Sequence, residues 1–289
     1  MANGNLHKAK GLKEDEFFTQ LSDVEKELKN YKEHFRNKVI FLNCDDPEES
    51  NFWKYFYLKF KELGLKKLVS THFENGKPAY KLERTNGDII KTPLTQKGDF
   101  RSEECVEILK EADIVITNPP FSLFREYVVQ LIKHDKKFLI IGNINAISYK
   151  EIFKLIKENK IWLGYNCVRY FKIPDGSMYE TARSFWYTNL DIKKRNDDFL
   201  LYKKYYGNKN EYPKYDNYPA ININKATDIP MDYKGEMGVP VTFLDKHNPK
   251  QFEIIGQMAT TKVDDFNYGY PYVNGKKKYA RIIICNKKA

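Results

Sequence analysis

The 289-residue sequence has few of the features that mark metal, disulfide or membrane proteins. Its four cysteines form no CxxC pair, and its five histidines include no HExxH and none at metal-ligand spacing with the cysteines. We therefore expect no metal and no disulfide framework, as in the reducing cytoplasm. The longest apolar runs, such as Phe138–Ile141, are too short to cross a bilayer. The first ten residues, MANGNLHKAK, lack the apolar segment of a signal peptide.

Acidic residues are outnumbered by basic ones, 39 against 49, which gives a net charge of +10. This balance favours a polyanionic partner, although a lysine-rich solvated surface would have the same charge. The excess lies mainly in residues 193–289, which hold 18 Lys or Arg against 11 Asp or Glu, and 11 of the 21 tyrosines. The helical period is also lost there. We therefore predict a domain over 1–192, followed by a smaller, β-rich module over 193–289.

The first domain alternates between apolar runs and helical periods. Four short runs predict strands that are buried on both faces: Val39–Leu42, Leu65–Thr71, Ile114–Thr117 and Phe138–Ile141. The alternation predicts an α/β fold with a mostly parallel sheet and right-handed crossovers. Strand-like segments near 166–172 and 184–190 would complete the sheet as an antiparallel pair at one edge.

Local signals place the helices and turns between these strands. Residues 1–20 are interpreted as an arm and a loop. Ser22 and Glu25 form a capping box before a helix that stops near Asn37, and Ser50 begins a helix through Leu63. Further helices are expected over 102–111, up to about Lys133, and over about 148–158. The dipeptide Asn86-Gly87 predicts a type I′ turn within a hairpin over 79–95.

The segment Asn118-Pro119-Pro120-Phe121 carries the clearest chemical signal. It follows the strand Ile114–Thr117 at its carboxyl end, where ligands bind in open α/β sheets. The Asn118 side-chain oxygen and the Pro119 carbonyl can accept the two hydrogens of a planar amine such as that of adenine, which frees the nitrogen lone pair. Proline fixes its own φ and restricts the preceding residue, so these acceptors would be held rigidly. Phe121 offers a face for an unstacked base, worth roughly 1–3 kcal/mol. Alternatively, the prolines only end the strand and Phe121 packs into the core.

Three polar residues are candidates for contacts with a cofactor. Asp45 and Asp46 follow the first strand, where a carboxylate could bind cofactor hydroxyls or an amine. The alternative is an acidic residue that is stabilised at a helix N-terminus by the helix dipole. Thr19 could contact a cofactor carboxylate, or it could lie in an ordinary turn that enters a helix.

Candidates for the remainder of a nucleotide-like cofactor are weaker. Asp99 could accept a hydrogen bond from an adenine amine, with Phe100 against the ring, although Gly-Asp-Phe carries little information by itself. His72 follows the second strand, where a ribose-binding acid would be expected, and Glu74 is a poor substitute for such an acid.

Two segments of the module 193–289 mix basic and aromatic residues. They are Lys203-Lys204-Tyr205-Tyr206 and the stretch that begins with Lys276, Lys277 and Lys278 and ends at Arg281. Such mixtures suit phosphate contact and base stacking, and solvated surface loops would have a similar composition. We predict DNA contacts there because an enzyme that acts on the amine of a DNA adenine requires a part that holds DNA.

Several segments together resemble the EcoRI-type adenine-specific DNA methyltransferases. They span almost the whole chain: Lys13–Thr19, Asn43–Pro47, Ser50–Phe52, Asn118–Phe121, Trp162–Asn166, Trp186–Leu190 and Met237–Asp245. The resemblance implies the class I methyltransferase fold, which is Rossmann-like, with S-adenosylmethionine as methyl donor. It implies N6-methyladenine in double-stranded DNA as product, formed on a flipped-out base, with residues 193–289 as the target-recognition part.

The same resemblance implies where the cofactor binds. Residues Glu16 to Thr19, including Phe18, would cover its methionine end. The turn from Asn43 and Cys44 to Asp46 would replace the usual Phe-x-Gly-x-Gly loop, since no glycine occurs between Val39 and Leu63.

Alternative functions remain compatible with the same residues. An Asn-Pro-Pro-aromatic loop also suits an enzyme that methylates RNA adenine or a protein glutamine amide, although a glutamine substrate needs no basic aromatic module. A catalytically silent DNA-binding protein on the same fold is a further alternative. A modification enzyme paired with a restriction endonuclease, a solitary regulator and a phage-defence enzyme would all have this sequence pattern.

Overall fold

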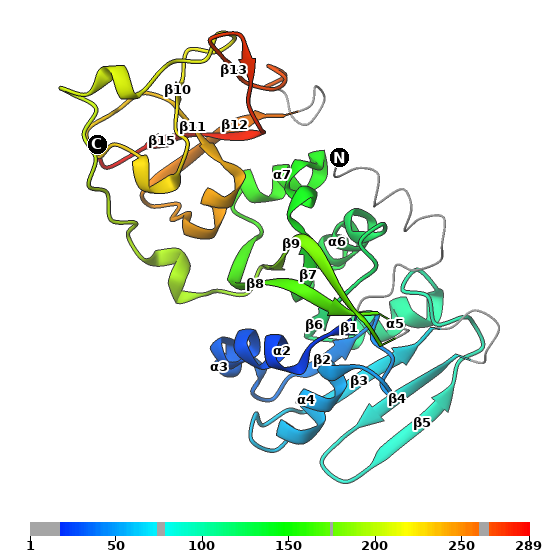
Figure 1. Cartoon of the computed structure of the whole chain (residues 1–289). Helices are drawn as coiled ribbons and strands as arrows, with labels where there is room; N and C mark the ends of the chain where they lie inside the picture. Colours follow the sequence, from blue (N-terminus) through cyan, green and yellow to red (C-terminus); the bar gives the residue numbers. More distant parts are fainter. Residues whose placement is uncertain (1–17, 74–78, 174–175, 260–265) are drawn as a thin grey trace. The chain divides into compact units, whose positions relative to one another are not determined.

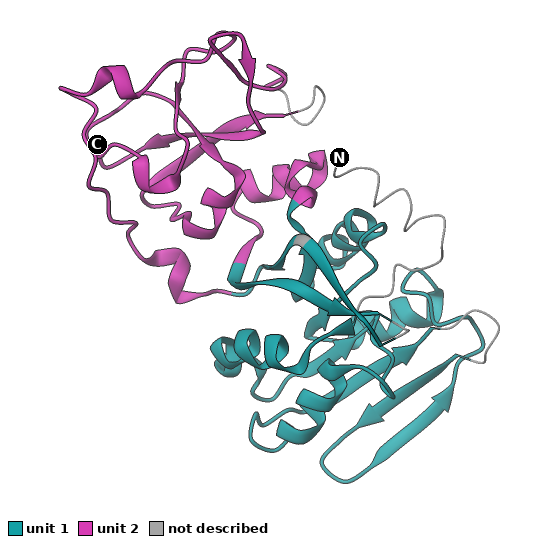
Figure 2. Ribbon diagram, in the orientation of Figure 1, with its two compact units in different colours: residues 1–144, 164–190 teal, residues 145–163, 191–289 magenta. Residues whose placement is uncertain are grey.

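The computed structural model describes residues 18–73, 79–173, 176–259 and 266–289. The chain divides into two compact units (Figure 2). Unit 1 comprises the described residues of 1–144 and 164–190, and unit 2 those of 145–163 and 191–289. The expected N-terminal arm, with Glu16 and Phe17 of the cofactor-covering segment, and Glu74 lie outside the described residues.

Nine strands of the described residues form one sheet in the order β1-β8-β9-β7-β6-β2-β3-β4-β5 (Figure 1). Their bounds are β1 Phe18–Thr19, β2 Val39–Leu42, β3 Lys67–His72, β4 Tyr80–Arg84, β5 Ile89–Pro93, β6 Ile114–Thr117, β7 Lys137–Asn143, β8 Trp162–Lys172 and β9 Met178–Thr188. The four central strands, β7, β6, β2 and β3, run parallel. The prediction of an α/β fold around a parallel sheet is confirmed.

Antiparallel strands flank this parallel centre on both sides, which corrects the expected single antiparallel edge. Strand β9 pairs with β7, and β8 lies between β9 and the short β1. At the other side β4 pairs with β3, and β5 forms the edge. The order of the strands reverses between β2 and β6, so the loops that follow these two strands open at the switch point of the sheet, where ligands bind.

The helices of unit 1 connect these strands. They are α2 Leu21–Leu28, the 3₁₀ turn η1 Lys29–Tyr31, α3 Lys32–Phe35, α4 Asn51–Lys59, α5 Glu103–Glu111 and α6 Phe124–Lys133. Ser50 caps α4 as predicted, because its hydroxyl accepts from the N–H groups of Phe52 and Trp53 at 3.0 and 3.4 Å. Helix α4 ends at Lys59, before the predicted Leu63.

The predicted capping box at Ser22 is wrong. Helix α2 starts right after β1, so Gln20 is its N-cap, and the Gln20 carbonyl accepts from the N–H groups of Asp23 and Val24 at 3.1 Å. Ser22 therefore lies within the first turn, with its side chain exposed.

The hairpin β4–β5 occurs where Asn86-Gly87 predicted it, but its turn differs. Arg84 pairs with Ile89, and the Thr85 N–H donates to the Asp88 carbonyl at 3.0 Å, which leaves a four-residue loop. Neither Asn86 nor Gly87 has a positive φ, so the turn is not type I′. Loops of this length are most often built around a type I turn, which needs no positive φ.

A buried carboxylate joins α2 to β8. Glu27 is fully buried and accepts from the Tyr31 hydroxyl, from the backbone N–H groups of Tyr165 and Asn166, and from the Asn166 amide at 2.7–2.8 Å. Burial raises the pKa of Glu27, and these donors oppose that shift. A Cβ at Gly164 would overlap the Glu27 carboxylate, so glycine permits the close approach of β8. The contact ties α2, which begins two residues after Thr19, to β8.

We expect Glu27→Ala to lower the free energy of unfolding by about 3 kcal/mol or more, because it leaves several buried donors without an acceptor. Urea denaturation would measure the loss. Glu25→Ala, an exposed position on the same helix, should change stability by no more than about 0.5 kcal/mol. Equal effects of the two substitutions would contradict the account of this contact.

Unit 2 contains a smaller antiparallel-rich sheet. Its strands follow the order β10-β11-β15-β12, and a separate hairpin is formed by β13 and β14. The bounds are η2 Ile144–Ser148, α7 Lys150–Lys157, η3 Lys193–Asn196, η4 Lys209–Glu211, β10 Ile221–Asn222, η5 Ala226–Asp228, β11 Met237–Pro240, η6 Val241–Lys246, β12 Phe252–Met258, β13 Tyr272–Val273, β14 Lys276–Lys277 and β15 Arg281–Asn286.

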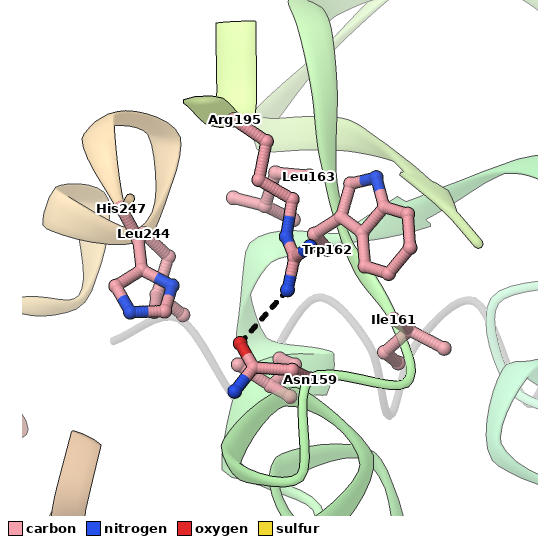
Figure 3. Close-up of a pocket in the computed structure, with 8 residues that line it drawn as sticks. Asn159, Ile161, Trp162, Leu163, Arg195, Leu244 and His247 are labelled. Atoms are coloured by element: carbon pink, nitrogen blue, oxygen red, sulfur yellow. Dashed lines mark hydrogen bonds between the residues drawn. The ribbon is translucent and has the colours of Figure 1, made fainter. Parts of the chain in front are cut away.

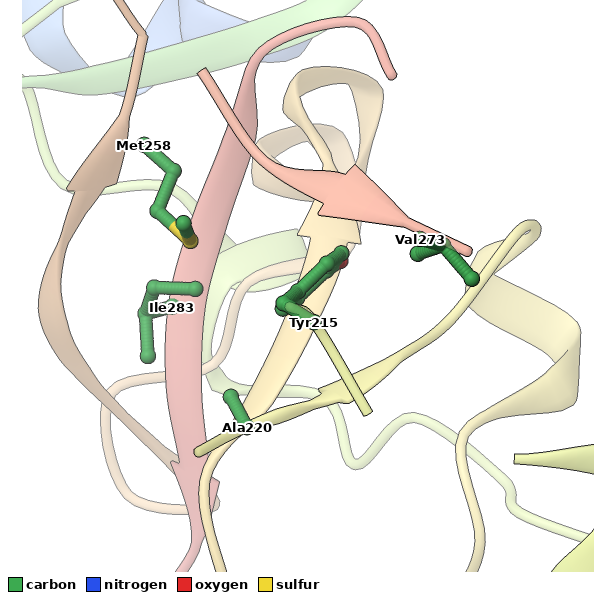
Figure 4. Packing of buried hydrophobic residues seen from close by; sticks show 5 residues of the cluster. All are labelled: Tyr215, Ala220, Met258, Val273 and Ile283. Atoms are coloured by element: carbon green, nitrogen blue, oxygen red, sulfur yellow. The ribbon is translucent and has the colours of Figure 1, made fainter. Parts of the chain in front are cut away.

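A small apolar cluster holds one side of this sheet together (Figure 4). Its buried members come from the sheet and from the loops that cover it: Tyr215, Ala220, Met258, Val273 and Ile283. The Tyr215 hydroxyl donates to the Asn222 side chain or the Gly238 carbonyl, both at 3.0 Å. A Cβ at Gly238 would overlap the Tyr215 ring, so this glycine is required by packing.

A second contact in unit 2 joins the segment after α7 to η3 (Figure 3). The Arg195 guanidinium lies 4.1 Å from the centre of the Trp162 ring and donates to the Asn159 side chain at 2.8 Å. Burial lowers the pKa of the neighbouring His247 to about 4, so this imidazole is neutral near pH 7. These contacts explain why residues 145–163 belong to unit 2, together with 191–289. In the described part of the chain, no helix has the length and apolar character needed to cross a membrane.

Candidate active site

The carboxylate of Asp45 connects the loops that follow β2 and β6. Its Oδ2 accepts from the Thr117 hydroxyl at the end of β6 and from the Asn118 backbone N–H at 3.3 Å, and its Oδ1 accepts from the Ser50 hydroxyl at 3.0 Å. The Asp45 carbonyl accepts from the Ser70 hydroxyl of β3. One side chain therefore fixes the start of the Asn118–Phe121 loop relative to the neighbouring strand.

Burial makes the Asp45 carboxyl a weaker acid than usual. The residue is 9% exposed, and removal from water raises the pKa of its carboxyl to about 6, against the hydrogen bonds that favour the charged form. All three hydrogen bonds to this carboxylate require it to accept. The charged form accepts these hydrogen bonds better, but the cost of removing its charge from water is larger, so folding favours the protonated form.

The turn before Asp45 is also buried and hydrogen-bonded. The Asn43 side-chain oxygen accepts from the Thr71 hydroxyl at 3.2 Å, and the Cys44 N–H donates to the Thr117 hydroxyl at 3.1 Å. Burial raises the pKa of the Cys44 thiol well above its usual value, so the thiol is neutral near pH 7. A buried, neutral thiol of this kind is a poor nucleophile, and the Cys44 backbone makes the contact with Thr117.

The Asn118–Phe121 loop turns directly into helix α6. The Leu123 N–H donates to the Pro120 carbonyl at 3.0 Å, and the Asn118 side-chain oxygen is buried. Phe121 is only 8% exposed, and its ring meets Phe171 of β8 edge-on at 5.9 Å. In this conformation the ring is covered, so its proposed stacking face becomes available only if the loop moves.

Thr19 lies beside this loop through β8. It pairs with Phe171 in the β1–β8 ladder, next to Phe18, and its carbonyl accepts from the Asn51 amide at 2.8 Å. Among the described residues, the buried Thr19 hydroxyl and the buried Asn43 amide nitrogen have no hydrogen-bond partner. Buried polar atoms normally have a partner, so both atoms fit contact with a bound molecule.

His72 and Asp46 meet at the carboxyl end of β3. His72 Nε2 lies 3.4 Å from Asp46 Oδ2, and the His72 ring stacks on Tyr80 at 4.7 Å and 10°. The Tyr80 hydroxyl donates to Asp46 at 3.5 Å, and Lys91 of β5 lies 3.7 Å from the Tyr80 ring centre. Residues of the hairpin β4–β5 thus lie beside the candidate site. The sequence after β3 has no clear candidate for a ribose-binding acid, and Asp46 places a carboxylate beside His72 instead.

The Gly98-Asp99-Phe100 segment packs against the same end of β3. Gly98 has a φ of +71°, and a Cβ there would overlap the His72 carbonyl. Phe100 is buried and meets Tyr127 of α6 edge-on at 4.9 Å. Asp99 is bound by the Arg101 side chain at 2.6 and 2.8 Å, which lowers the pKa of Asp99. Its expected role as an acceptor for an adenine amine stays a prediction.

The predicted residues of unit 1 lie in β1, at the carboxyl ends of β2, β3 and β6, and in the loop before α5, while the predicted lysines lie in unit 2. Lys276 and Lys277 are exposed in β14, and Lys203 and Lys204 occur in the segment before η4. Sequence reasoning missed Thr117, Ser70 and Tyr80, whose hydroxyls complete the site. Thr117 and Tyr80 lie at strand ends and Ser70 lies within β3, but which atoms of Asp45 and Asp46 their hydroxyls contact depends on the sheet order. No group of three or more His, Cys, Asp or Glu that could hold a metal occurs among the described residues.

The parallel centre of the sheet is typical of α/β enzymes, which bind ligands at the carboxyl ends of such strands, and the candidate residues that follow β2, β3 and β6 lie there. The family model for the adenine-specific methyltransferase EcoRI matches residues 5–287. The chain belongs to this family of adenine-specific methyltransferases.

Individual relatives match over nearly their full lengths. The Type II methyltransferase M.EcoRI of Escherichia coli is 48% identical over 99% of this chain and 97% of its own. The Type II methyltransferase M.MgeORF184P of Mycoplasma genitalium is 41% identical over 97% of this chain and 98% of its own. The Type II methyltransferase M.MpnI of Mycoplasma pneumoniae is 37% identical over 98% of each chain. No solved structure matches the chain.

Asp45 should make stability depend on pH in a defined direction. Its pKa is about 6 in the folded chain and about 3.9 unfolded, so between these values the folded state holds the extra proton. This group therefore favours folding at low pH, and its contribution is lost as pH rises through 6, at up to about 1.4 kcal/mol per unit.

Urea unfolding of the wild type and Asp45→Asn between pH 5 and 8 would test this direction. The stability of the wild type minus that of the variant should increase as pH falls below about 6.5. A difference that stays constant over this range would show that Asp45 keeps an ordinary pKa.

Proposed function

We propose that the chain transfers a methyl group from S-adenosylmethionine to the N6 amine of adenine in double-stranded DNA, with Asn118 and Pro119 as the acceptors that hold the amine. The observation that carries this proposal is the Asp45 contact, which holds Thr117 and Asn118 at the switch point of the sheet. The family to which the chain belongs supports the choice of adenine.

The strand order supports a class I methyltransferase fold. Strands β3, β2, β6 and β7 form a parallel centre whose order reverses between β2 and β6, and antiparallel β9 follows β7. A doubly wound sheet of this kind binds its ligands outside the carboxyl ends of its strands. Of the predicted cofactor residues, Asn43 to Asp46 and His72 lie at those ends, which supports the proposal.

The residues at these ends fit S-adenosylmethionine, which supplies a methyl group on a positively charged sulfur. The hydroxyl of Thr19 and the amide of Asn43 would bind its polar methionine end, because both atoms are buried without a partner among the described residues. Asp46, beside His72, would accept from the ribose hydroxyls. Phe100, held against Tyr127, would pack on the adenine ring of the cofactor.

The chain's own residues then activate the target amine by position. The amine nitrogen is a weak nucleophile because its lone pair is delocalised into the ring. The Asn118 side-chain oxygen and the Pro119 carbonyl would accept its two hydrogens and favour a pyramidal nitrogen. The bound donor would supply the methyl group to this nitrogen as its own bond from sulfur to that methyl breaks, and the surplus proton of the amine would pass to water. Alignment supplies most of the acceleration, on the order of 7–11 kcal/mol, so no general base is required.

Phe121 would stack on the flipped adenine only after its loop has moved. A flipped adenine loses stacking that is worth about a few kcal/mol, and an aromatic face can replace part of it. Because Phe121 is covered by Phe171, we propose that the loop shifts when the base enters, which exposes the ring.

Unit 2 would hold and recognise the DNA. Residues 193–289 contain seven more basic than acidic residues, which suits phosphate contacts. The relatives are Type II methyltransferases, so we propose that this enzyme serves a restriction-modification system and protects the sites that a partner endonuclease would cleave.

The replacement Asn118→Ala should reduce the single-turnover rate of methyl transfer by at least about two orders of magnitude, the scale lost when one positioned polar group is removed. Donor affinity, measured by calorimetry, should stay near the wild-type value, because Asn118 contacts Asp45 through its backbone. Asn118→Asp keeps an acceptor oxygen and should retain more activity than the alanine variant. Wild-type turnover in Asn118→Ala would refute the assigned role.

A further inference from the structure

The hairpin of β13 and β14 has a fixed, tight turn. Tyr272 pairs with Lys277 and Val273 with Lys276, so two residues connect the strands. Asn274 has a φ of +50° and Gly275 a φ of +72°. Positive φ values at both positions are the pattern of a type I′ turn, whose twist matches that of a two-stranded ribbon.

Two neighbouring side chains hold this turn from outside the hairpin. The Asp216 carboxylate accepts from the backbone N–H groups of Asn274 and Gly275 at 3.1 and 2.8 Å. The Asp216 N–H donates to the Tyr272 carbonyl at 2.8 Å. Asn217 accepts from the Tyr272 N–H at 3.2 Å and donates to the carbonyls of Tyr268 and Tyr270 at 3.0 Å.

The hairpin is also anchored in the apolar cluster, while its outer side is open. Val273 is 6% exposed and packs in the cluster with Tyr215 and Ile283 (Figure 4). Asn274, Lys276 and Lys277 are exposed. A two-stranded ribbon is rarely stable by itself, so this one is ordered only because the rest of unit 2 holds it.

The charge of the ribbon has one sign. The sequence from Tyr268 to Arg281 contains three lysines and one arginine, with no Asp or Glu. The Asp216 carboxylate, which contacts the hairpin, accepts hydrogen bonds from the turn. Lys277 Nζ lies 3.8 Å from the centre of the Tyr270 ring, and Tyr279 at the end of the segment is 88% exposed. The exposed face therefore combines cations with aromatic rings.

We propose that the β13–β14 hairpin is a preformed ribbon that enters the major groove of duplex DNA, with Lys276 and Lys277 on the phosphates and Asn274 at the tip facing base edges. The major groove admits a two-stranded ribbon, and an asparagine amide can pair with the N6 and N7 atoms of adenine. Asp216 is a positioning residue, because it orders the tip before DNA arrives. The inference rests on the proposed function, which names duplex DNA as substrate.

The first experiment tests the phosphate contacts with the double variant Lys276→Gln/Lys277→Gln in the full chain. Binding to a methylatable duplex and to a duplex of unrelated sequence is measured across salt concentrations. Two lost contacts should flatten the dependence of log affinity on log salt by roughly 1.8 for both duplexes. Affinity near 0.1 M salt should fall by one to two orders of magnitude.

The matched control is Lys154→Gln/Lys160→Gln, which removes two charges from exposed positions elsewhere in unit 2. It should leave the salt slope near the wild-type value. Equal slopes for the two double variants would overturn the proposal, since they would show a general charge effect without a specific ribbon.

The second experiment tests the tip and its support. Asn274→Gly, which removes the amide but tolerates the positive φ of the turn, should reduce the preference for the methylatable duplex over the unrelated one by about tenfold or more, with the salt slope unchanged, since a bidentate base contact discriminates on this scale. Asp216→Ala should reduce the same preference, and Asp216→Asn, which keeps an acceptor, should restore part of it. A merely structural role of Asp216 would instead lower the unfolding midpoint and weaken binding to both duplexes equally.

The activity of the wild type distinguishes a failure of the ribbon inference from a failure of the proposed function. If the wild type methylates duplex DNA while the ribbon variants bind and discriminate like wild type, the ribbon inference fails and the proposed function stands. If the wild type neither binds nor methylates duplex DNA, the proposed function itself fails.

Discussion

The architecture of the site depends on one buried carboxylate. Asp45 follows β2, but its hydrogen-bond partners come from β6 and from the start of α4. A carboxylate out of water is tolerated only when its oxygens are satisfied, and removal of one partner from such a group is strongly destabilising. The geometry of the Asn118–Phe121 loop is therefore tied to the register of β2 and β6. Strands β2 and β6 are neighbours at the switch point of the sheet. The position of the proposed amine-binding loop therefore depends on the sheet order, and the Asp45 contact in turn stabilises that order.

Much of the first unit was predictable because its signals are local. Continuous apolar runs such as Val39–Leu42 and Ile114–Thr117 require burial on both faces, and the structure places both in the parallel centre. Ser50 was identified as a helix cap from its position alone. The loop at Asn118 was found because a polar residue and two prolines directly follow a buried strand. The mixed α/β architecture follows from such signals, and so does membership of the methyltransferase family, through the resemblance of whole segments.

The remainder could not be read from the sequence because it depends on long-range pairing. The place of β8 and β9 in the sheet is set by pairing with β7 and β1, which no local pattern encodes. The Ser22 capping box failed because β1 ends at Thr19, so Gln20 is the N-cap and helix α2 begins at Leu21. Asn86-Gly87 forms a turn of another type, while Asn274-Gly275 adopts the positive φ values because Asp216 holds it. The same dipeptide thus forms different turns, according to what supports it.

The central claim is that this arrangement methylates adenine in duplex DNA. Mass spectrometry of nucleosides from unmethylated duplex DNA, treated with the protein and S-adenosylmethionine, tests it most directly, with RNA and protein pools treated in parallel. The account predicts N6-methyladenine in the duplex DNA alone. Methylated RNA adenine or methylated glutamine in place of it, or no methylated product despite donor binding by calorimetry, would contradict the account.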